Sequence, residues 1–361
     1  MQIKYFLLFL FSLVCASLSA QPYNTENTEF TIKSKTYSNI LPSVQLLKDK
    51  WHQVPNKQSN YGFSQSEMSA KYHWKNIIFT VAQRLDYFVK TTPDTALAFY
   101  LAKKDKQIND KYALDLTLFH QRSNGFRLGY QWQWHTLTSR VHLGYWKINS
   151  SRNTILNGYV NGDENNKISG KLALTENYTH RNYFRRPNNN NWNNNGKGIT
   201  FDMQFDWQIS QNMLILLEVN DLYSKFSQDN LGFSQGVVDT EGTYINNVGG
   251  KAYLPLYQGV ESQENFNFNL PKYIKLTSRY QYDGVTYIGR YKKQANTDFY
   301  YLGFELDHGD SKTQYTLDLK HLAPSINYKN NWISSSIEID HVNINKSMQL
   351  NLGISLYFTF L

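Results

Sequence analysis

Residues 199–209 read Ile-Thr-Phe-Asp-Met-Gln-Phe-Asp-Trp-Gln-Ile, so every second side chain in this stretch is apolar. Successive side chains of a β-strand point to opposite faces of the sheet, which gives an extended segment here one apolar and one polar face. The same alternation is clear in 126–135 and in 348–361. These segments predict long β-strands with one face in an apolar medium and the other in water.

The pattern continues with lower contrast over most of the chain after residue 66. The further predicted strands are 67–75, 77–88, 95–102, 112–121, 137–147, 168–178, 213–220, 272–282, 285–292, 298–307, 313–321 and 332–341, with another near 250–256. Turn residues separate many of them: Asp283-Gly284 is a two-residue hairpin signal, and Ser123–Gly125, Ser210–Asn212 and His308–Asp310 mark further turns. The count predicts about sixteen strands, with fourteen or eighteen also open, because bacterial barrels have even numbers.

Strand length separates the two architectures that use such strands. Strands of soluble sandwiches are about 5–6 residues long, whereas a tilted strand needs about 9–11 residues to cross a bilayer. The clearest segments here are longer than ten residues, and aromatic residues make up 16% of the chain. Aromatic residues near strand ends are typical of the girdles at membrane interfaces. We therefore predict an all-β, antiparallel, up-and-down transmembrane barrel over 63–361.

The composition excludes several other classes of protein. After residue 20 the apolar run Met213–Leu217 has only five residues, far fewer than the ~20 apolar residues of a membrane-spanning helix. A disordered chain has few aromatic residues, and a disulfide-stapled domain needs paired cysteines, whereas Cys15 is the one cysteine. The sequence has no nucleotide-binding loop and no platform for nucleic acid. We predict no cofactor and no metal.

The first twenty residues have the pattern of a secretory signal peptide. Lys4 precedes an apolar stretch over 6–14, and small residues lead to Ala20, after which we expect cleavage. Residues 21–62 are predicted as an N-terminal extension, with helical spacing of apolar residues over Ser43–Val54. Two interpretations stay open: a short helix that plugs the lumen or rests at the periplasmic mouth, and an extension with little fixed structure.

The chain ends in Tyr357, Phe358, Thr359, Phe360 and Leu361, inside its most regular predicted strand. This ending resembles the C-terminal signature of Gram-negative outer-membrane β-barrel proteins, in which a final amphipathic strand is read by the barrel assembly machinery. The last residue of that signature is most often Phe, whereas here Phe360 is penultimate. The resemblance implies an outer-membrane location, contact with lipid and lipopolysaccharide, and Tyr357, Phe358, Phe360 and Leu361 as the assembly signal. It identifies no single porin family, and the oligomeric state stays open.

In such a barrel the polar face of each strand lines the lumen. Barrels of 16–18 strands leave an aqueous channel, and rings of charge select ions of the opposite sign. The predicted lining has both signs, so we expect weak selectivity, with a slight anion preference from a net charge of +8. The lining candidates are Asp115, Arg127, Arg140, His142, Asp202, Asp206, Glu218, Arg279, Arg290 and Glu305.

Four longer connections are predicted as loops: 148–167, 179–197, 224–248 and 258–270. The second contains Arg181, Arg185 and Arg186 beside an asparagine-rich run. Because the planar guanidinium matches phosphate and carboxylate groups, this cluster is a candidate site for lipopolysaccharide phosphates or an anionic solute. A solvated polar loop is the alternative.

The strand count leaves the orientation of the barrel unresolved. If the last strand ends in the periplasm, counting backward places a short turn such as Asp283-Gly284 or His308–Asp310 outside the cell. Short turns are expected on the periplasmic side instead. Either the external side is unusually short, or the count is wrong near Pro324–Asn331.

The predicted function is a porin-like channel for passive diffusion of small hydrophilic solutes, because nearly every strand has a polar inward face. Two alternatives stay open: a barrel that exports or assembles a surface polysaccharide or protein, and an outer-membrane enzyme. The nine histidines include no pair with the spacing of zinc peptidases, and no Gly-x-Ser-x-Gly elbow occurs. We therefore predict that the chain is not an enzyme.

Overall fold

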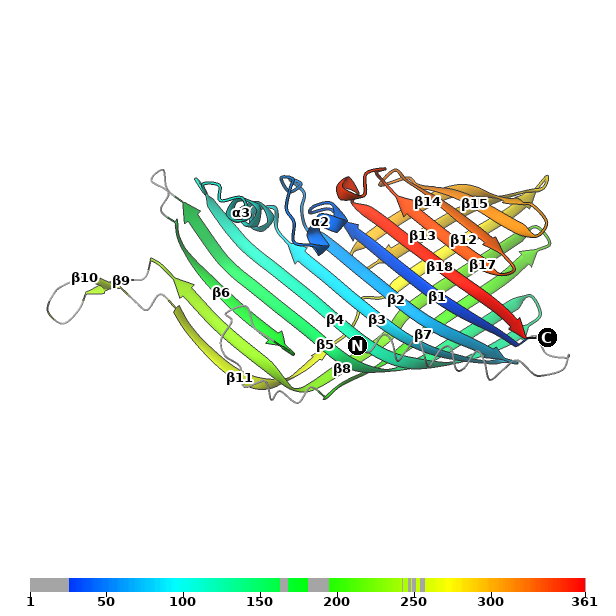
Figure 1. Cartoon of the computed structure of the whole chain (residues 1–361), viewed down its shortest axis with the longest axis horizontal. Coiled ribbons are helices and arrows are strands. Elements are labelled where there is room, and N and C mark those ends of the chain that lie inside the picture. Colours follow the sequence, from blue (N-terminus) through cyan, green and yellow to red (C-terminus); the bar gives the residue numbers. More distant parts are fainter. Residues whose placement is uncertain are drawn as a thin grey trace.

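The computed structural model of the chain describes residues 26–162, 168–180, 195–241, 243–245, 248, 251–253 and 257–360. Figure 1 shows long, tilted strands that form one continuous wall, with short helices along its upper rim. No helix in these ranges is long and apolar enough to cross a membrane. The predicted signal peptide lies outside the described residues.

Fourteen strands pair in a closed antiparallel ring. Their order around the ring is β1 (Glu26–Ser38), β2 (Tyr61–Trp74), β3 (Ile77–Thr91), β4 (Lys111–Trp134), β5 (Leu137–Gly162), β7 (Asn195–Ser210), β8 (Met213–Asp239), β12 (Tyr273–Tyr282), β13 (Val285–Gln294), β14 (Thr297–Asp307), β15 (Ser311–Asp318), β16 (Ala323–Asn330), β17 (Ile333–Ile339) and β18 (Gln349–Phe360). Strand β18 pairs with β1 from Phe360 opposite Glu26 to Gln349 opposite Tyr37, and this pairing closes the ring. The prediction of an antiparallel barrel of fourteen to eighteen strands is confirmed.

Two further strands extend the wall beyond the ring at one end. Strand β6 (Ile168–Tyr178) lies between the second halves of β5 and β8, and β11 (Tyr257–Phe268) pairs with the other edge of β8. Strands β9 (Thr243–Ile245) and β10 (Lys251–Tyr253) form a separate hairpin. The three longest strands, β4, β5 and β8, have 24, 26 and 27 residues, more than a bilayer requires.

These extensions correct three of the predicted loops. Within 148–167, strand β5 continues to Gly162; within 224–248, strand β8 continues to Asp239; and 258–270 is mostly β11. Outside the membrane neither face of a strand meets lipid. The apolar–polar alternation therefore loses contrast there, although the backbone still pairs with its neighbours.

The two ends of the barrel differ in their connections. Short connections join the strands at one end, which we call the short-turn end: 75–76, 135–136, 211–212, 283–284, 308–310 and 331–332. Glu26 and Phe360 lie at this end too. The opposite loop end carries α2 (Ser43–Leu47), α3 (Pro93–Lys103), the 3-10 helix η1 (Ile344–Lys346) and the extended strands. Because outer-membrane barrels have short periplasmic turns, we assign the short-turn end to the periplasmic side.

Strand β16 explains why the sequence left the orientation unresolved. The prediction treated 313–321 and 332–341 as consecutive strands, whereas β16 lies between them and pairs with both β15 and β17. One missing strand reverses the direction of every strand before it. With β16 in place, Asp283-Gly284 and His308–Asp310 both lie at the short-turn end, as expected for periplasmic turns.

Other predicted elements also differ from the structure. Strand β1 occupies 26–38, so part of the predicted 21–62 extension belongs to the barrel wall. The helix expected over Ser43–Val54 is only α2, and it lies at the loop end, away from the periplasmic mouth. Residues 95–102 are helix α3, not a strand. The predicted turn Ser123–Gly125 lies inside β4, where the register with β5 shifts after Arg122.

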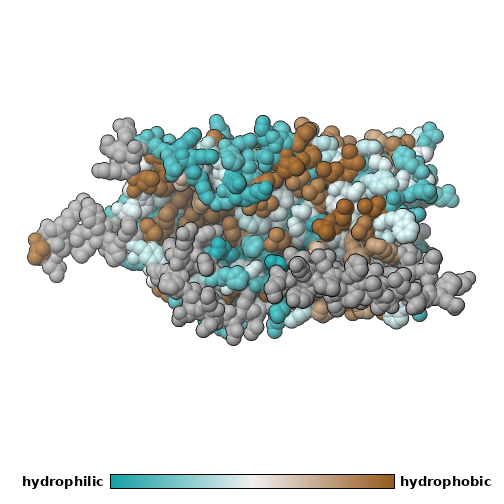
Figure 2. Space-filling model, viewed as in Figure 1, coloured by the Kyte–Doolittle hydropathy of each residue, from teal (hydrophilic) through white to brown (hydrophobic). Residues whose placement is uncertain are grey.

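The outer face of the ring is apolar. On the face seen in Figure 2, brown apolar residues lie across the wall and teal residues gather near the helix-bearing rim. Strands β13 and β14 have 10 and 11 residues, a length that matches a bilayer crossing. Exposed tryptophans lie next to the short turns, as in an interfacial girdle: Trp74, Trp132, Trp134, Trp207 and Trp332. The chain is a transmembrane β-barrel of the outer-membrane type.

Candidate functional site

The polar faces of the strands meet inside the barrel, and most of the predicted lining residues contact one another there. Arg140 pairs with Asp206 at 2.7 Å, and Arg279 pairs with Glu305. His142 lies against Gly129 of the next strand. Arg127, Asp202, Glu218 and Arg290 line lumen cavities. Asp115 differs from the others, because it is exposed at the loop end, where its backbone N–H donates to the Thr95 hydroxyl.

One ion pair joins two walls that are not neighbours. The Arg84 guanidinium on β3 donates two hydrogen bonds, of 2.9 and 2.6 Å, to the two carboxylate oxygens of Asp221 on β8. Strands β3 and β8 are four positions apart in the ring. Arg84 is 9% exposed and Asp221 is 3% exposed, so the pair is closed off from bulk water. Its forked geometry is the strongest form of such a contact.

Hydrogen bonds continue from this pair to the opposite side of the ring. Arg84 Nε also contacts the Asp86 carboxylate at 2.8 Å, and the Gln65 amide donates to Asp86 at 2.8 Å. The Gln294 amide on β13 then donates to the Gln65 oxygen on β2. Strands β2 and β13 are seven positions apart in a ring of fourteen, which means that they face each other across the full lumen. The chain of contacts therefore crosses the lumen from wall to wall.

Further charges join the same level of the lumen. Arg127 donates to both oxygens of Glu67, at 2.8 and 3.2 Å, and lies 3.9 Å from Asp202. Asp202 accepts a 2.7 Å hydrogen bond from the backbone N–H of Asp221. Lys33 pairs with Glu67 at 3.2 Å. We call this set the polar layer: Lys33, Gln65, Glu67, Arg84, Asp86, Arg127, Asp202, Asp221 and Gln294.

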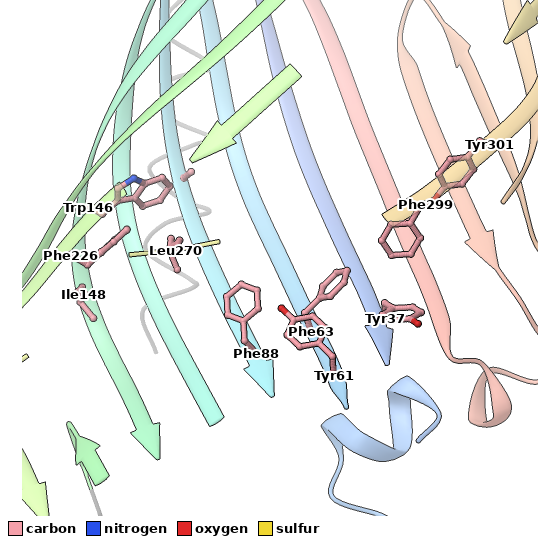
Figure 3. Packing of buried hydrophobic residues seen from close by; sticks show 11 residues of the cluster. Tyr37, Tyr61, Phe63, Phe88, Trp146, Ile148, Phe226, Leu270, Phe299 and Tyr301 are labelled. Atoms are coloured by element: carbon pink, nitrogen blue, oxygen red, sulfur yellow. The ribbon is translucent and has the colours of Figure 1, made fainter. Parts of the chain in front are cut away.

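An aromatic layer fills the lumen on the loop side of the polar layer. It comprises Tyr37, Tyr61, Phe63, Ala82, Phe88, Trp146, Ile148, Phe226, Leu270, Phe299 and Tyr301, with Phe119, Phe268 and Ala295 packed against it. Figure 3 shows the buried side chains of this layer, which come from several strands of the wall, from Trp146 to Tyr301. Separate parts of the wall touch again here: the ring centroids of Tyr37 and Phe299 are 5.4 Å apart, and those of Phe119 and Phe268 are 4.7 Å apart.

Two cavities lie between these layers and the short-turn end. The periplasmic vestibule, of about 670 Å³, has a polar lining that includes Gln208, Arg279, Glu305 and Lys329. The mid-lumen cavity, of about 320 Å³, lies beside the polar layer and shares Asn327 and Ser334 with the vestibule. Polar cavities thus lie one after the other from the short-turn end to the centre of the barrel, where the layers of side chains fill the lumen.

A third cavity lies on the outer face of the wall at the loop end. It has a volume of about 750 Å³ and lies between α2, α3 and strands β3 to β6. Its floor includes Val89, Leu118 and Leu156, which alternate with lumen-facing residues, while Trp51 and Phe99 lie above it. This cavity is therefore separate from the lumen.

The described residues contain one acid–histidine pair within hydrogen-bond distance that resembles part of a catalytic group. Asp318 contacts His321 Nδ1 at 2.8 Å. His321 Nε2 is buried without a hydrogen-bond partner in the described part of the chain, and the rings of Tyr37 and Phe299 lie 4.9 and 5.1 Å from its ring. The Tyr37 and Phe299 rings therefore cover the side of the imidazole that faces away from Asp318. Within the described ranges, no group of three potential metal ligands occurs.

Several predicted site residues do not belong to the lumen layers or cavities described above. Arg181, Arg185, Arg186 and Leu361 are outside the described residues. Tyr357 and Phe358 lie on β18, at the seam with β1. Conversely, the sequence candidates omitted Arg84, Asp86 and Asp221. Arg84 and Asp86 are alternate, oppositely charged residues of the predicted strand 77–88, a signal that both face the lumen.

Comparison with known proteins yields distant structural likenesses. No family model matches the chain, and no curated protein matches it in sequence. A deletion mutant of TodX, a monoaromatic hydrocarbon channel, is 10% identical over 94% of this chain and 91% of its own, with a TM-score of 0.46. The Ralstonia pickettii toluene transporter TbuX is 7% identical over 94% and 90%, with a TM-score of 0.31. The Escherichia coli outer membrane protease OmpT is 7% identical over 95% and 100%, with a TM-score of 0.27.

Proposed function

We propose that this outer-membrane barrel is a gated channel for a small hydrophilic solute, closed by its polar layer in the conformation described above. The observation that supports this proposal is the forked ion pair between Arg84 and Asp221, which joins separate walls inside the lumen. This proposal changes the predicted passive porin in one respect. The lumen is polar, as predicted, but it conducts only when the contacts between its walls break.

The composition of the lumen favours a hydrophilic solute. The periplasmic vestibule and the mid-lumen cavity are lined by charged, amide and hydroxyl side chains. An apolar solute would gain little from such a lining and would displace the water that solvates it. The aromatic layer is the exception, because it fills the lumen with apolar rings on the loop side of the polar layer.

The polar layer has the properties of a closed gate. Buried charges are costly to separate because their attraction is strong where water is scarce. When the channel opens, water replaces the contact at both Arg84 and Asp221. The closed and open states therefore need not differ greatly in free energy. A channel held shut in this way opens in steps when the wall contacts break, in contrast to a permanently water-filled pore.

The test is single-channel recording of the refolded protein in a planar lipid bilayer. We expect the wild type to remain closed most of the time. The double variant Arg84→Gln, Asp221→Asn keeps the polar side chains but removes the ion pair. Its open fraction should rise by about tenfold or more, since ~1.4 kcal/mol of lost closed-state stability is a factor of ten.

The matched control is Lys103→Gln, which removes an exposed ion pair with Asp49 at the loop end. This control should gate as the wild type does. A wild type with steady, long-lived conductance would overturn the gate. A folded double variant that stays silent would overturn the assignment of the gate to the Arg84–Asp221 pair.

A further inference from the structure

The mid-lumen cavity has more positive than negative side chains around it. Its lining includes five cations, Lys33, Lys35, Lys275, Arg290 and Lys292, and two carboxylates, Glu218 and Glu338. These residues come from strands on both sides of the lumen, namely β1, β8, β12, β13 and β17. The cavity is therefore a positively charged region inside a wall whose outer face is apolar.

Three of the five cations have carboxylate partners. Lys275 pairs with Glu218 at 2.7 Å, and Lys292 pairs with Glu338 at 3.3 Å. Lys33 pairs with Glu67 of the polar layer. These pairs hold both carboxylates of the cavity, although Glu218 also attracts Lys35 at longer range.

Lys35 and Arg290 are the two cations of the cavity with no carboxylate within salt-bridge distance in the described part of the chain. Lys35 Nζ lies 3.6 Å from the centroid of the Tyr273 ring, across the lumen from its own strand. Arg290 lies 5.7 Å from the Tyr301 ring, and its buried Nε has no hydrogen-bond partner among the described residues. An aromatic face stabilises a cation less than a carboxylate does. Both cations thus retain capacity for a negative partner.

The rest of the lining supplies neutral hydrogen-bond donors. Hydroxyl groups surround the cavity, from Thr31, Ser34, Ser325, Ser334, Ser336 and Ser355, together with the amides of Asn327 and Asn351. Such groups donate hydrogen bonds to anionic oxygens without adding charge. A volume of about 320 Å³ suits an anion of few atoms. From this charge imbalance and this lining, we propose that the mid-lumen cavity binds a small oxyanion of two or more negative charges, such as phosphate or a short dicarboxylate.

The proposal names the solute class of the channel and so rests on the proposed function. The site itself does not require the gate to open. The cavity adjoins the periplasmic vestibule at Asn327 and Ser334, so we expect an anion to enter from the short-turn end while the polar layer is closed. A positively lined dead end also concentrates anions by focusing the field within low-dielectric walls.

The test is isothermal titration calorimetry of the refolded full chain in detergent, in chloride buffer of low ionic strength. Inorganic phosphate and succinate are titrated separately, which distinguishes a phosphate site from a dicarboxylate site. We expect saturable binding of at least one of them. Arg290→Gln and Lys35→Gln should each weaken that binding by about tenfold, because hydrogen bonds to charged groups are the strongest in such a site.

Two further variants keep the result interpretable. Arg290→Lys retains the charge and should restore part of the affinity, and Lys103→Gln at the loop end should bind as the wild type does. Each variant is first shown to be folded by circular dichroism. Absence of binding for both anions, or equal binding by a folded Arg290→Gln variant, would overturn the site. Because calorimetry in detergent needs no conduction, a permanently open wild type that binds phosphate would overturn only the gate.

Discussion

Two glycines on the inner wall determine how the aromatic layer packs. Trp146 and Phe226 are fully buried, and each lies flat against a neighbouring strand at a glycine. A Cβ atom at Gly125 would lie 2.6 Å from Trp146 Cε3, and one at Gly198 would overlap the Phe226 ring. The absence of a side chain at these positions lets large rings lie against the wall without blocking each other.

We predict that Gly198→Ala destabilises the barrel by about 1–3 kcal/mol, the usual cost of overpacking a tight interior. The control is Gly289→Ala, because a Cβ at Gly289 meets nothing within 4 Å. Urea unfolding of both variants, followed by tryptophan fluorescence in detergent, measures the difference. Equal midpoints for the two variants would show that Phe226 moves aside at no cost.

The sequence predicts the face on which a residue lies better than the partner that it contacts. Alternation places Arg127, Asp202 and Glu218 on the polar face, and the structure has them there. The contact between Arg84 and Asp221 depends on the distance between separate walls, which is set by the whole ring. No local pattern of the sequence contains that distance, so the sequence predicts an open channel where the lining residues in fact meet across the lumen.

At the scale of elements, helix α3 shows where alternation misleads. Residues 95–102 have apolar side chains that were assigned to a strand, but Thr92, Pro93 and Asp94 precede them. The Thr92 hydroxyl accepts a hydrogen bond from the Thr95 N–H, and proline is suited to the first helical position. The N-cap threonine and the proline therefore favour a helix over a strand for residues 95–102, which lie outside the membrane.

We predict that Thr92→Ala weakens α3 locally by about 1 kcal/mol, the typical value of an N-cap. Hydrogen exchange of the α3 amides should become faster by about fivefold, while exchange in β1 to β4 stays as in the wild type. Thr92→Ser keeps the hydroxyl and should restore slow exchange. Unchanged α3 exchange in the alanine variant would mean that packing on the wall, not the cap, holds this helix.

The strands were predicted well where one face meets lipid and poorly where neither does. Strand β7 is predicted nearly in full because its alternation is sharp, and β13 and β14 are predicted nearly in full although their contrast is lower. The outer halves of β5 and β8 mix apolar and polar residues without a sharp alternation, which is why the sequence predicts loops there. Strand β1 was missed because its Lys, Ser and Thr residues give it few apolar positions, although it pairs with β2 and β18 along its length.

At the scale of the whole molecule, the distribution of connections predicts which end of the barrel faces the cell exterior. The short-turn end has only two- and three-residue connections between the ring strands, and the loop end has the helices and the extended wall. The orientation is open to a clean test, because the chain has no cysteine after Cys15.

We predict that Lys104→Cys, beside α3, is labelled in intact cells by a membrane-impermeant maleimide, whereas Gln211→Cys is not. Both positions are exposed at opposite ends of the barrel. Permeabilised cells provide the control, since both cysteines should then react. Labelling of Gln211→Cys alone in intact cells would reverse the orientation.

The seam of the ring has a consequence for the order of events during assembly. The Thr31 and Ser355 hydroxyls lie 2.8 Å apart across the β1–β18 pair, although 324 residues separate them in the chain. Closing so long a loop is entropically unfavourable and slow. Until it closes, both β1 and β18 present unpaired edges that template aggregation. The edge of β1 that pairs with β18 is therefore among the last to form its hydrogen bonds, although β1 comes early in the chain. Until those bonds form, the nascent barrel most needs a chaperone to cover this edge.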